Sequence, residues 1–270
     1  MTGVNSDMSE QRRANPGPLA VFLGIIVLAA FWGCAGLIPQ TLRHDTHMKP
    51  VLPEGRGDFT IDLVDSSTVF SKEGLLIRVR YLTDVELNER FPPLFDGRQV
   101  NPYTREEKDP ELGYVLPRFT VFELTITNNT YAKVELDPAR AVMISAGETY
   151  RYYDPGREGA VVLGGNSFTK YYKMELGTSG NEREINLERM GIIYKTVYHR
   201  GRPIFRGDTR SGLLVFDPLP EENDELLLSI REFVLSFDAS DNPEETIDVE
   251  FRFDVDQQVV KVEENGQGEG

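Results

Sequence analysis

Cysteine is almost absent from this chain, which has Cys34 as the only one among 270 residues. A single thiol cannot form a disulfide within the chain, so the fold must depend on core burial and hydrogen bonding. Histidine is scarce too, and of the three in the chain only His199 lies outside the N-terminal region that holds His44 and His47. Because a hydrolytic serine or cysteine needs a base beside it, this scarcity disfavours nucleophilic catalysis.

Motifs that identify an enzyme or a cofactor site are also missing. The chain has no G-x-S-x-G, no P-loop, no H-E-x-x-H and no C-x-x-C. We therefore predict a protein that is not an enzyme and that binds no cofactor and no metal ion. One enzymatic alternative stays open, because two of the 44 acidic residues could form a carboxylate pair that acts on envelope polymers.

Positive charge is in short supply. The chain has 29 basic and 44 acidic residues, and its formal net charge is −15 at pH 7. Such a surface repels phosphate backbones, which excludes nucleic acid as a partner. It would also be repelled by anionic lipid headgroups, so a location at a membrane would require a tether.

One long apolar run stands out against this polar background. Residues 19–38, LAVFLGIIVLAAFWGCAGLI, contain no charge and follow Arg12 and Arg13. About 20 residues with a rise of about 1.5 Å each span about 30 Å, the thickness of the hydrocarbon core of a bilayer. The run is typical of a cleaved export signal or of an uncleaved anchor with its N-terminus in the cytoplasm. A buried helix of a soluble domain is the third interpretation.

The end of this run, AAFWGC at residues 29–34, resembles the lipobox of bacterial lipoproteins. The resemblance implies cleavage after Gly33 and a diacylglycerol on Cys34. A lipidated protein would reside at the outer membrane, whereas an uncleaved anchor would hold it at the inner membrane. Both interpretations predict that the chain beyond residue 38 is extracytoplasmic, in the periplasm or cell envelope, and tethered to a membrane.

Composition divides the chain into four parts. We expect a signal peptide or anchor over residues 1–38, an extended linker over 39–57, a folded domain over 58–262 and a disordered tail over 263–270. The linker is predicted from its prolines and glycines. The pair His44 and His47 within it lacks the further ligands of a metal site. The length of the domain allows one β-sandwich or two small β domains.

Apolar and polar residues alternate with a period of two over residues 59–63, 75–81, 120–127 and 247–255. This period predicts strands with one buried and one solvent-facing side. The Asn-rich turn after residue 127 predicts a hairpin with a strand at 132–136. A phase slip at Arg231-Glu232 predicts a β-bulge. The helix formers of residues 181–193 predict one short helix.

Three segments, FELTITNNT at 122–130, VELDP at 134–138 and GLLVFD at 212–217, resemble strands of the immunoglobulin-like sandwich of bacterial surface lipoproteins. The resemblance implies an all-β fold. It would be an immunoglobulin-like antiparallel β-sandwich with long loops and one short helix, preceded by an N-terminal hydrophobic helix. It also implies a role in binding or spacing, and it carries no catalytic residues.

Two segments are candidates for a binding surface. Residues 84–117 form a long, proline-rich stretch with aromatic side chains, and residues 194–210 form a basic patch on an acidic chain. The binding residues predicted from the two segments are Tyr103, Tyr114, Tyr198, Arg200, Arg202 and Arg206. The alternatives are a loop that caps a sheet edge and a hairpin whose arginines pair with the domain's own carboxylates.

We therefore expect a membrane-tethered, non-catalytic interaction or envelope-assembly module. A cell-surface protein that binds carbohydrate or peptide is the main alternative. The expected partners are the membrane, through the anchor or the lipid, and a protein or glycan of the envelope.

Overall fold

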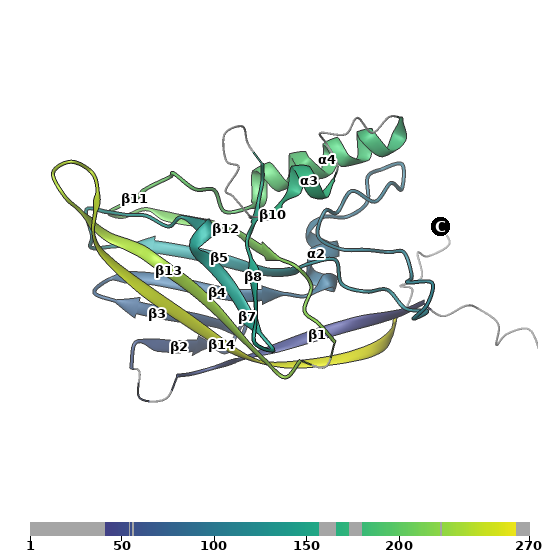
Figure 1. Ribbon diagram of the computed structural model, residues 1–270, viewed down its shortest axis with the longest axis horizontal. Coiled ribbons are helices and arrows are strands. Elements are labelled where there is room, and N and C mark those ends of the chain that lie inside the picture. The colour runs from purple at the N-terminus through teal and green to yellow at the C-terminus, as the bar shows by residue number, and fades with distance from the viewer. Residues whose placement is uncertain are drawn as a thin grey trace, which may run out of the picture. The chain divides into compact units, whose positions relative to one another are not determined.

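Two five-stranded antiparallel sheets dominate the computed structural model of the protein (Figure 1). The structure describes residues 41–53, 55, 57–156, 166–172, 180–221 and 223–262. The apolar run, Cys34 and the predicted tail lie outside these residues. The sheets confirm the predicted all-β class, and the described residues belong to one compact unit rather than to two small domains.

Each sheet joins strands that are distant in the sequence. The first sheet has the order β1 (Thr41–Val51), β14 (Pro243–Val262), β13 (Glu225–Phe237), β7 (Ala141–Ser145) and β8 (Glu148–Arg151). The second has the order β12 (Thr209–Phe216), β5 (Thr120–Asn128), β4 (Leu75–Leu82), β3 (Ser67–Lys72) and β2 (Phe59–Asp62). Two small pairs join β6 (Lys133–Val134) to β11 (Ile204–Phe205) and β9 (Tyr153–Asp154) to β10 (Asn166–Ser167).

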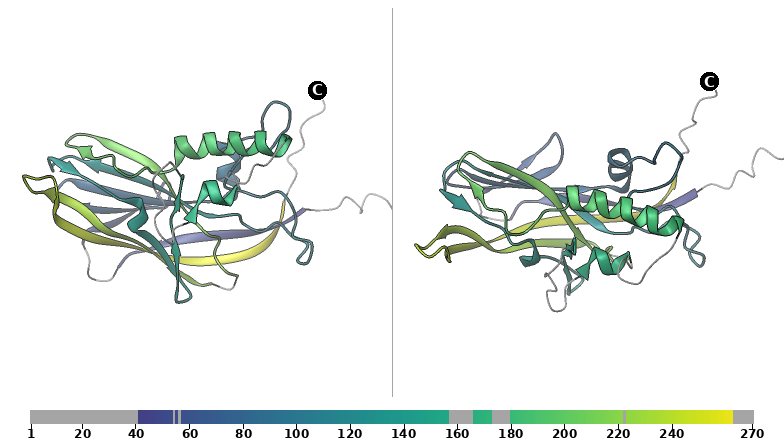
Figure 2. Two further views of the ribbon diagram at one scale, coloured as in Figure 1. Left: turned by 45° about the horizontal axis from the view of Figure 1, so that its top comes forward. Right: turned by 90° about the horizontal axis from the view of Figure 1, so that it is seen from above.

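The described residues form the helices α2 (Asp84–Arg90), α3 (Phe168–Tyr171) and α4 (Asn181–Thr196), with a 3₁₀ turn, η2, at Pro138–Arg140. Figure 2 shows that the three α-helices gather toward one end of the sheets, whereas the β13–β14 turn lies at the opposite end. The sequence therefore predicted fewer helices than the described residues form. The predicted helix of residues 181–193 corresponds to α4, which extends to Thr196.

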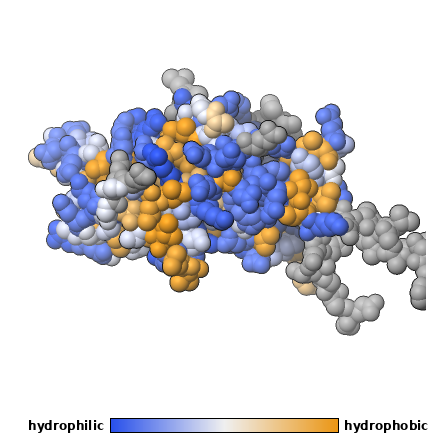
Figure 3. Space-filling view, turned by 90° about the horizontal axis from the view of Figure 1, so that it is seen from below, coloured by the Kyte–Doolittle hydropathy of each residue, from blue (hydrophilic) through white to orange (hydrophobic). Residues whose placement is uncertain are grey.

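Aromatic side chains hold the two sheets together. The rings of Phe59 in β2 and Phe251 in β14 have centroids 5.8 Å apart, and those of Phe122 in β5 and Phe253 in β14 are 5.4 Å apart. Each aromatic side chain removes about 150–250 Å² from water, which makes these pairs a main source of stability in a domain without disulfides. The outer surface is mixed, and Figure 3 shows hydrophobic patches among the hydrophilic residues on one side of the molecule.

The linker predicted over residues 39–57 was wrong for residues 41–51. Residues 41–51 form β1, which pairs with β14 along its whole length from Thr41–Val262 to Val51–Arg252. Pro50 has no amide N–H to donate. It is compatible with β1 because this strand lies at the edge of its sheet and has a neighbouring strand on one side only. The folded domain thus includes residues 41–51 and does not start at residue 58.

The predicted hairpin of residues 120–136 was also wrong. Strand β5 pairs with β4 and β12, whereas β6 pairs with β11. By contrast, the bulge predicted at Arg231-Glu232 is confirmed, because the β13–β14 register shifts between Ile230 and Phe233. Glu232 takes a left-handed conformation there, with φ at 53°.

Candidate functional site

A concave site of about 330 Å³ lies among α3, α4 and the loop that follows α2. We name it the arginine pocket, and its defining side chains are those of Arg105, Glu106, Glu107, Arg118, Tyr171 and Arg189. Arg105 and the two glutamates come from the segment that the sequence singled out as a binding surface. Arg118 follows this segment, and Arg189 comes from α4.

Tyr172 positions two of the arginines. Its hydroxyl accepts a hydrogen bond from Nη1 of Arg118 at 3.0 Å and donates one to the carbonyl of Pro102 at 2.5 Å. The guanidinium carbon of Arg189 lies 5.7 Å from the centroid of the same ring. Because Tyr172 is buried, it holds both cations on a rigid support.

Arg189 also joins α4 to the loop. Its Nη2 donates to the carbonyl of Gln99, and its Nη1 donates to Oδ1 of Asn186 one turn earlier, both at 3.3 Å. Asn186 is buried and donates to the carbonyl of Tyr172 at 3.3 Å. The helix, the loop and the α3 end therefore fix the Arg189 side chain from three directions.

The loop itself is tied to α2. The buried amide of Asn101 donates to the carbonyl of Leu87 at 3.0 Å and to Oδ1 of Asn88 at 2.8 Å. Thr104 donates to the same Asn88 oxygen at 2.6 Å. The helix begins with a capping box between Thr83 and Glu86, a signal that the sequence already contained. The loop is thus held in place before any ligand arrives.

The three arginines have no carboxylate within 4.0 Å among the described residues. Burial lowers the pKa of Arg189, and the charge of Arg118 lowers it further. Partial burial raises the pKa of Glu106, an effect that the charges of Arg43 and Arg189 oppose. The Nε groups of Arg118 and Arg189 are enclosed without an acceptor. Nearby carboxylates offset part of this charge, since Glu107 raises the pKa of Arg189 and Arg118 lowers that of Asp84. The pocket therefore holds three guanidinium groups that no carboxylate contacts directly, rather than cations without any counter-charge.

Two of the predicted binding residues are not on the surface. Tyr103 and Tyr198 are buried, with 0% and 1% of their area exposed, so the prediction that they contact a partner was wrong. The hydroxyl of Tyr103 lies 2.6 Å from Oγ1 of Thr196, at the end of α4. Aromatic residues in irregular segments pack into the core here because the helices and loops need an apolar filling against the sheets.

Tyr114 is half-buried at a second pocket, of about 290 Å³. Its hydroxyl donates to Oε1 of Glu221 at 2.7 Å, and its ring stacks on that of His44 at 6.2 Å. His44 is buried and His47 is exposed, because residues three apart on a strand face opposite sides. Among the residues that the structure describes, no cluster of His, Cys, Asp and Glu fits a metal ion.

The basic patch of residues 194–210 divides among several environments. Nη2 of Arg200 lies 3.5 Å from Asp154 and 3.7 Å from Asp137, as the pairing alternative predicted. Arg206 is exposed and donates to the carbonyl of Thr130 at 2.7 Å, and Arg202 is exposed. The expected hairpin is replaced by the end of α4 and the short β11.

Sequence reasoning did not find Arg118 and Arg189. Neither residue is part of a local motif, and Arg189 lies on a helix whose polar residues look like an ordinary solvated face. Only the positions of Arg105, Glu106 and Glu107 within the segment of residues 84–117 pointed toward this site.

No protein family, no curated protein and no solved structure matches this chain. Within the described part of the chain, no helix has the length and apolar character needed to cross a membrane.

Proposed function

We propose that this protein is a membrane-tethered, extracytoplasmic module that acts by binding a partner in the cell envelope, with the arginine pocket as its binding site. The observation that carries the proposal is the set of three guanidinium groups without a carboxylate partner, held in a concave site by packed elements. Guanidinium groups donate hydrogen bonds and remain charged, which suits them to recognition rather than to proton transfer.

The tether is proposed from the sequence. Residues 19–38 are apolar and follow two arginines, and the first strand of the domain begins soon after them at Thr41. The alternatives of a lipid on Cys34 and of an uncleaved helix both remain within the proposal, with an outer-membrane or an inner-membrane location respectively. An immunoglobulin-like class for the sandwich is also part of it, supported by the two facing antiparallel sheets.

The test is the mass of the N-terminal peptide of the protein isolated from membranes, combined with protease accessibility of the domain in spheroplasts. An acylated N-terminus at Cys34 would establish the lipoprotein, and an intact Met1 or Thr2 terminus would establish the anchor. Cys34→Ala should abolish acylation in the first case and change nothing in the second. Recovery of unmodified protein from the cytoplasm, protected from protease, would contradict the tether.

A carbohydrate- or peptide-binding role is the second candidate. The observation that favours it is the contribution of Arg105, Glu106 and Glu107 to the pocket, since these residues come from a long loop between elements, where binding residues are concentrated. A panel of acidic oligosaccharides and peptides should show binding that Arg118→Gln abolishes. Binding that persists in this variant would place the ligand elsewhere.

A further inference from the structure

We propose that the arginine pocket binds one compact oxyanion, the phosphate or carboxylate group of a small polar molecule, through Arg118 and Arg189. The inference rests on the proposed binding function and names its ligand class, but it does not depend on the membrane tether.

The charge balance of the pocket supports an anion. Other arginines of this acidic chain have carboxylate partners, for example Arg43 with Asp84 at 2.9 Å and Arg90 with Glu123 at 2.8 Å. In the arginine pocket, however, two partly buried guanidinium groups approach each other closely enough for Arg118 to lower the pKa of Arg189. Bringing like charges together in a partly desolvated site costs free energy, and a bound anion would offset this cost.

The geometry supports hydrogen bonding to oxygen. A guanidinium group has five N–H donors in a planar fork that fits carboxylate and phosphate groups. Arg118 uses Nη1 for Tyr172, and its Nη2 has no partner among the described residues. The side chain of Arg105 also has no partner there. Tyr172, itself bonded to the loop at Pro102, positions Arg118 in advance, so this side chain loses little conformational entropy when a ligand binds.

The size and the rim of the pocket select a small ligand. Its volume of about 330 Å³ is at the lower end of the range for small-molecule sites. Glu106 and Glu107 at its rim would repel a polyanion, as would the net charge of −15. A molecule with one or two negative charges fits these conditions, and a nucleic acid or an anionic polymer does not.

The experiment is isothermal titration of the full-length protein in nonionic detergent, with inorganic phosphate and with succinate at constant ionic strength. We expect saturable binding at one site, and the probe with the lower Kd distinguishes a phosphate ligand from a carboxylate ligand. Arg118→Gln and Arg189→Gln should each weaken binding at least tenfold. Absence of saturable binding for both probes would overturn the inference, and it would leave the result of the N-terminal mass measurement unaffected.

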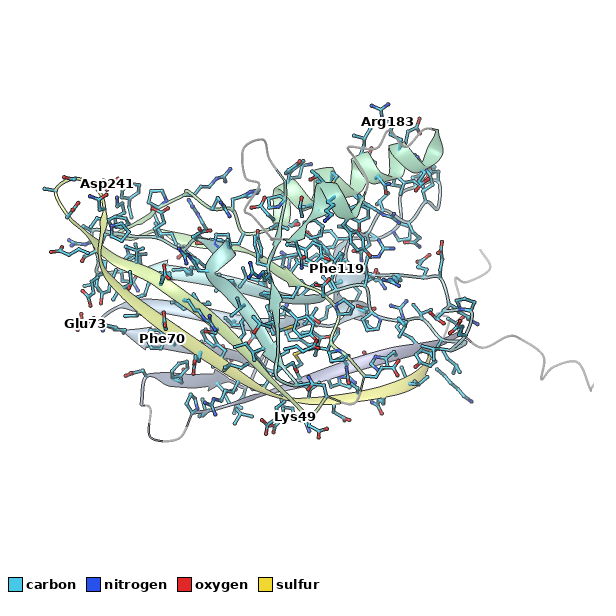
Figure 4. The ribbon with its side chains drawn as sticks, in the orientation of Figure 1. Lys49, Phe70, Glu73, Phe119, Arg183 and Asp241 are labelled. Atoms are coloured by element: carbon cyan, nitrogen blue, oxygen red, sulfur yellow. The ribbon has the colours of Figure 1, made fainter. Side chains whose placement is uncertain are left out.

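A matched control removes the same charge from the same helix. Arg183 is exposed and projects outward from α4 (Figure 4), so Arg183→Gln should leave the Kd unchanged. An equal loss in this variant would mean that only the overall charge matters, which would also overturn the inference.

Glu106→Gln should tighten binding several-fold because it removes a negative charge beside the cations. A tighter complex cannot result from a folding defect.

Tyr172→Phe tests the positioning of Arg118 without a change in charge. Loss of the hydroxyl frees Nη1 of Arg118 and should weaken binding by about threefold to tenfold. Arg118→Lys in the same assay should retain part of the affinity, because the charge remains but the planar fork is lost. Affinity in Tyr172→Phe equal to that of the wild type would contradict the assigned role of Tyr172.

Discussion

The side-chain amide of Asn128, at the end of β5, donates a hydrogen bond of 3.0 Å to the carbonyl of Ile204 in β11, 76 residues later. The same nitrogen donates to the carbonyl of Tyr131 at 2.9 Å, and the side-chain oxygen accepts from the amides of Thr130 and Tyr131. Asn128 has no exposed area. One asparagine therefore provides hydrogen-bond partners for two backbone carbonyls and two backbone amides just after β5 and in β11.

Asn128→Ala should lower the free energy of unfolding by about 3 kcal/mol, because several backbone groups would lose their partners inside the protein. Chemical denaturation measures this change. The adjacent Asn129 is exposed, so Asn129→Ala should change stability by less than about 0.5 kcal/mol. Equal effects of the two substitutions would contradict the role assigned to the buried amide.

Gly212 in β12 permits a close backbone contact. A Cβ at this position would lie 2.7 Å from Cα and 2.8 Å from N of Tyr198, whose amide donates to the carbonyl of Leu213 at 2.9 Å. Gly212→Ala should therefore lower the free energy of unfolding by about 2–3 kcal/mol, since neither backbone can move without breaking this contact. Thermal unfolding followed by circular dichroism measures the effect.

A second glycine provides the control with the opposite sign. Gly191 is in the middle of α4, and a Cβ there would meet nothing within 4 Å. Gly191→Ala should raise the free energy of unfolding by about 0.5–1 kcal/mol, because alanine loses less backbone entropy in a helix. A destabilised Gly191→Ala protein would show that the α4 surface is more crowded than the structure indicates.

Asp84, the first residue of α2, gives the protein a pH dependence. Its carboxylate lies 2.9 Å from Nη1 of Arg43, but burial outweighs this cation and raises the pKa of Asp84 to about 6. The folded protein thus holds the proton more tightly than the unfolded chain. The resulting stability is fully present below about pH 4, and it is lost as the pH rises through about 6.

The free energy of unfolding should be measured for wild-type protein and Asp84→Asn from pH 7 to pH 4. On acidification, the free energy of unfolding of the wild type should rise by about 2 kcal/mol relative to that of Asp84→Asn, because Asp84 takes up a proton and asparagine does not titrate. Parallel curves for the two proteins would show that Asp84 ionises at an ordinary pKa.

The bulge in β13 places Glu232 at a positive φ of 53°, a conformation that costs a residue with a Cβ free energy. Glu232→Gly should raise the free energy of unfolding by about 0.5–1 kcal/mol, as its exposed ion pair with Arg140 contributes little. Arg231→Gly, at the neighbouring position without a positive φ, should lower it by about 1 kcal/mol. Denaturant midpoints of the two variants check both signs.

Local patterns account for what could be predicted. The alternation in residues 75–81 predicted a strand, and Leu75, Ile77 and Val79 are indeed fully buried in β4. The phase slip at Glu232 predicted the bulge, and the helix formers predicted the position of α4. Each of these features depends on the period or the propensity of neighbouring residues, which the sequence displays directly.

The choice of strand partner could not be predicted in this way. Alternation defines which side of a strand is buried, but it does not define which other strand lies beside it. Residues 41–51 contain Pro50 and looked like a linker, yet β14 supplies a partner for the whole segment. The Asn-rich turn after β5 suggested a hairpin, yet the next strand, β6, pairs with β11, and the amide of Asn128 also bonds to β11 at Ile204.

The sequence by itself determined the all-β class, the acidic charge and the apolar run that underlies the proposed tether. Only the tertiary structure decided that Tyr103 and Tyr198 belong to the core, and that Arg118 and Arg189 meet at one tyrosine. The reason is that burial and charge clustering arise from contacts between residues far apart in the chain. Such contacts form when sheets and helices pack, and no local period of the sequence specifies them.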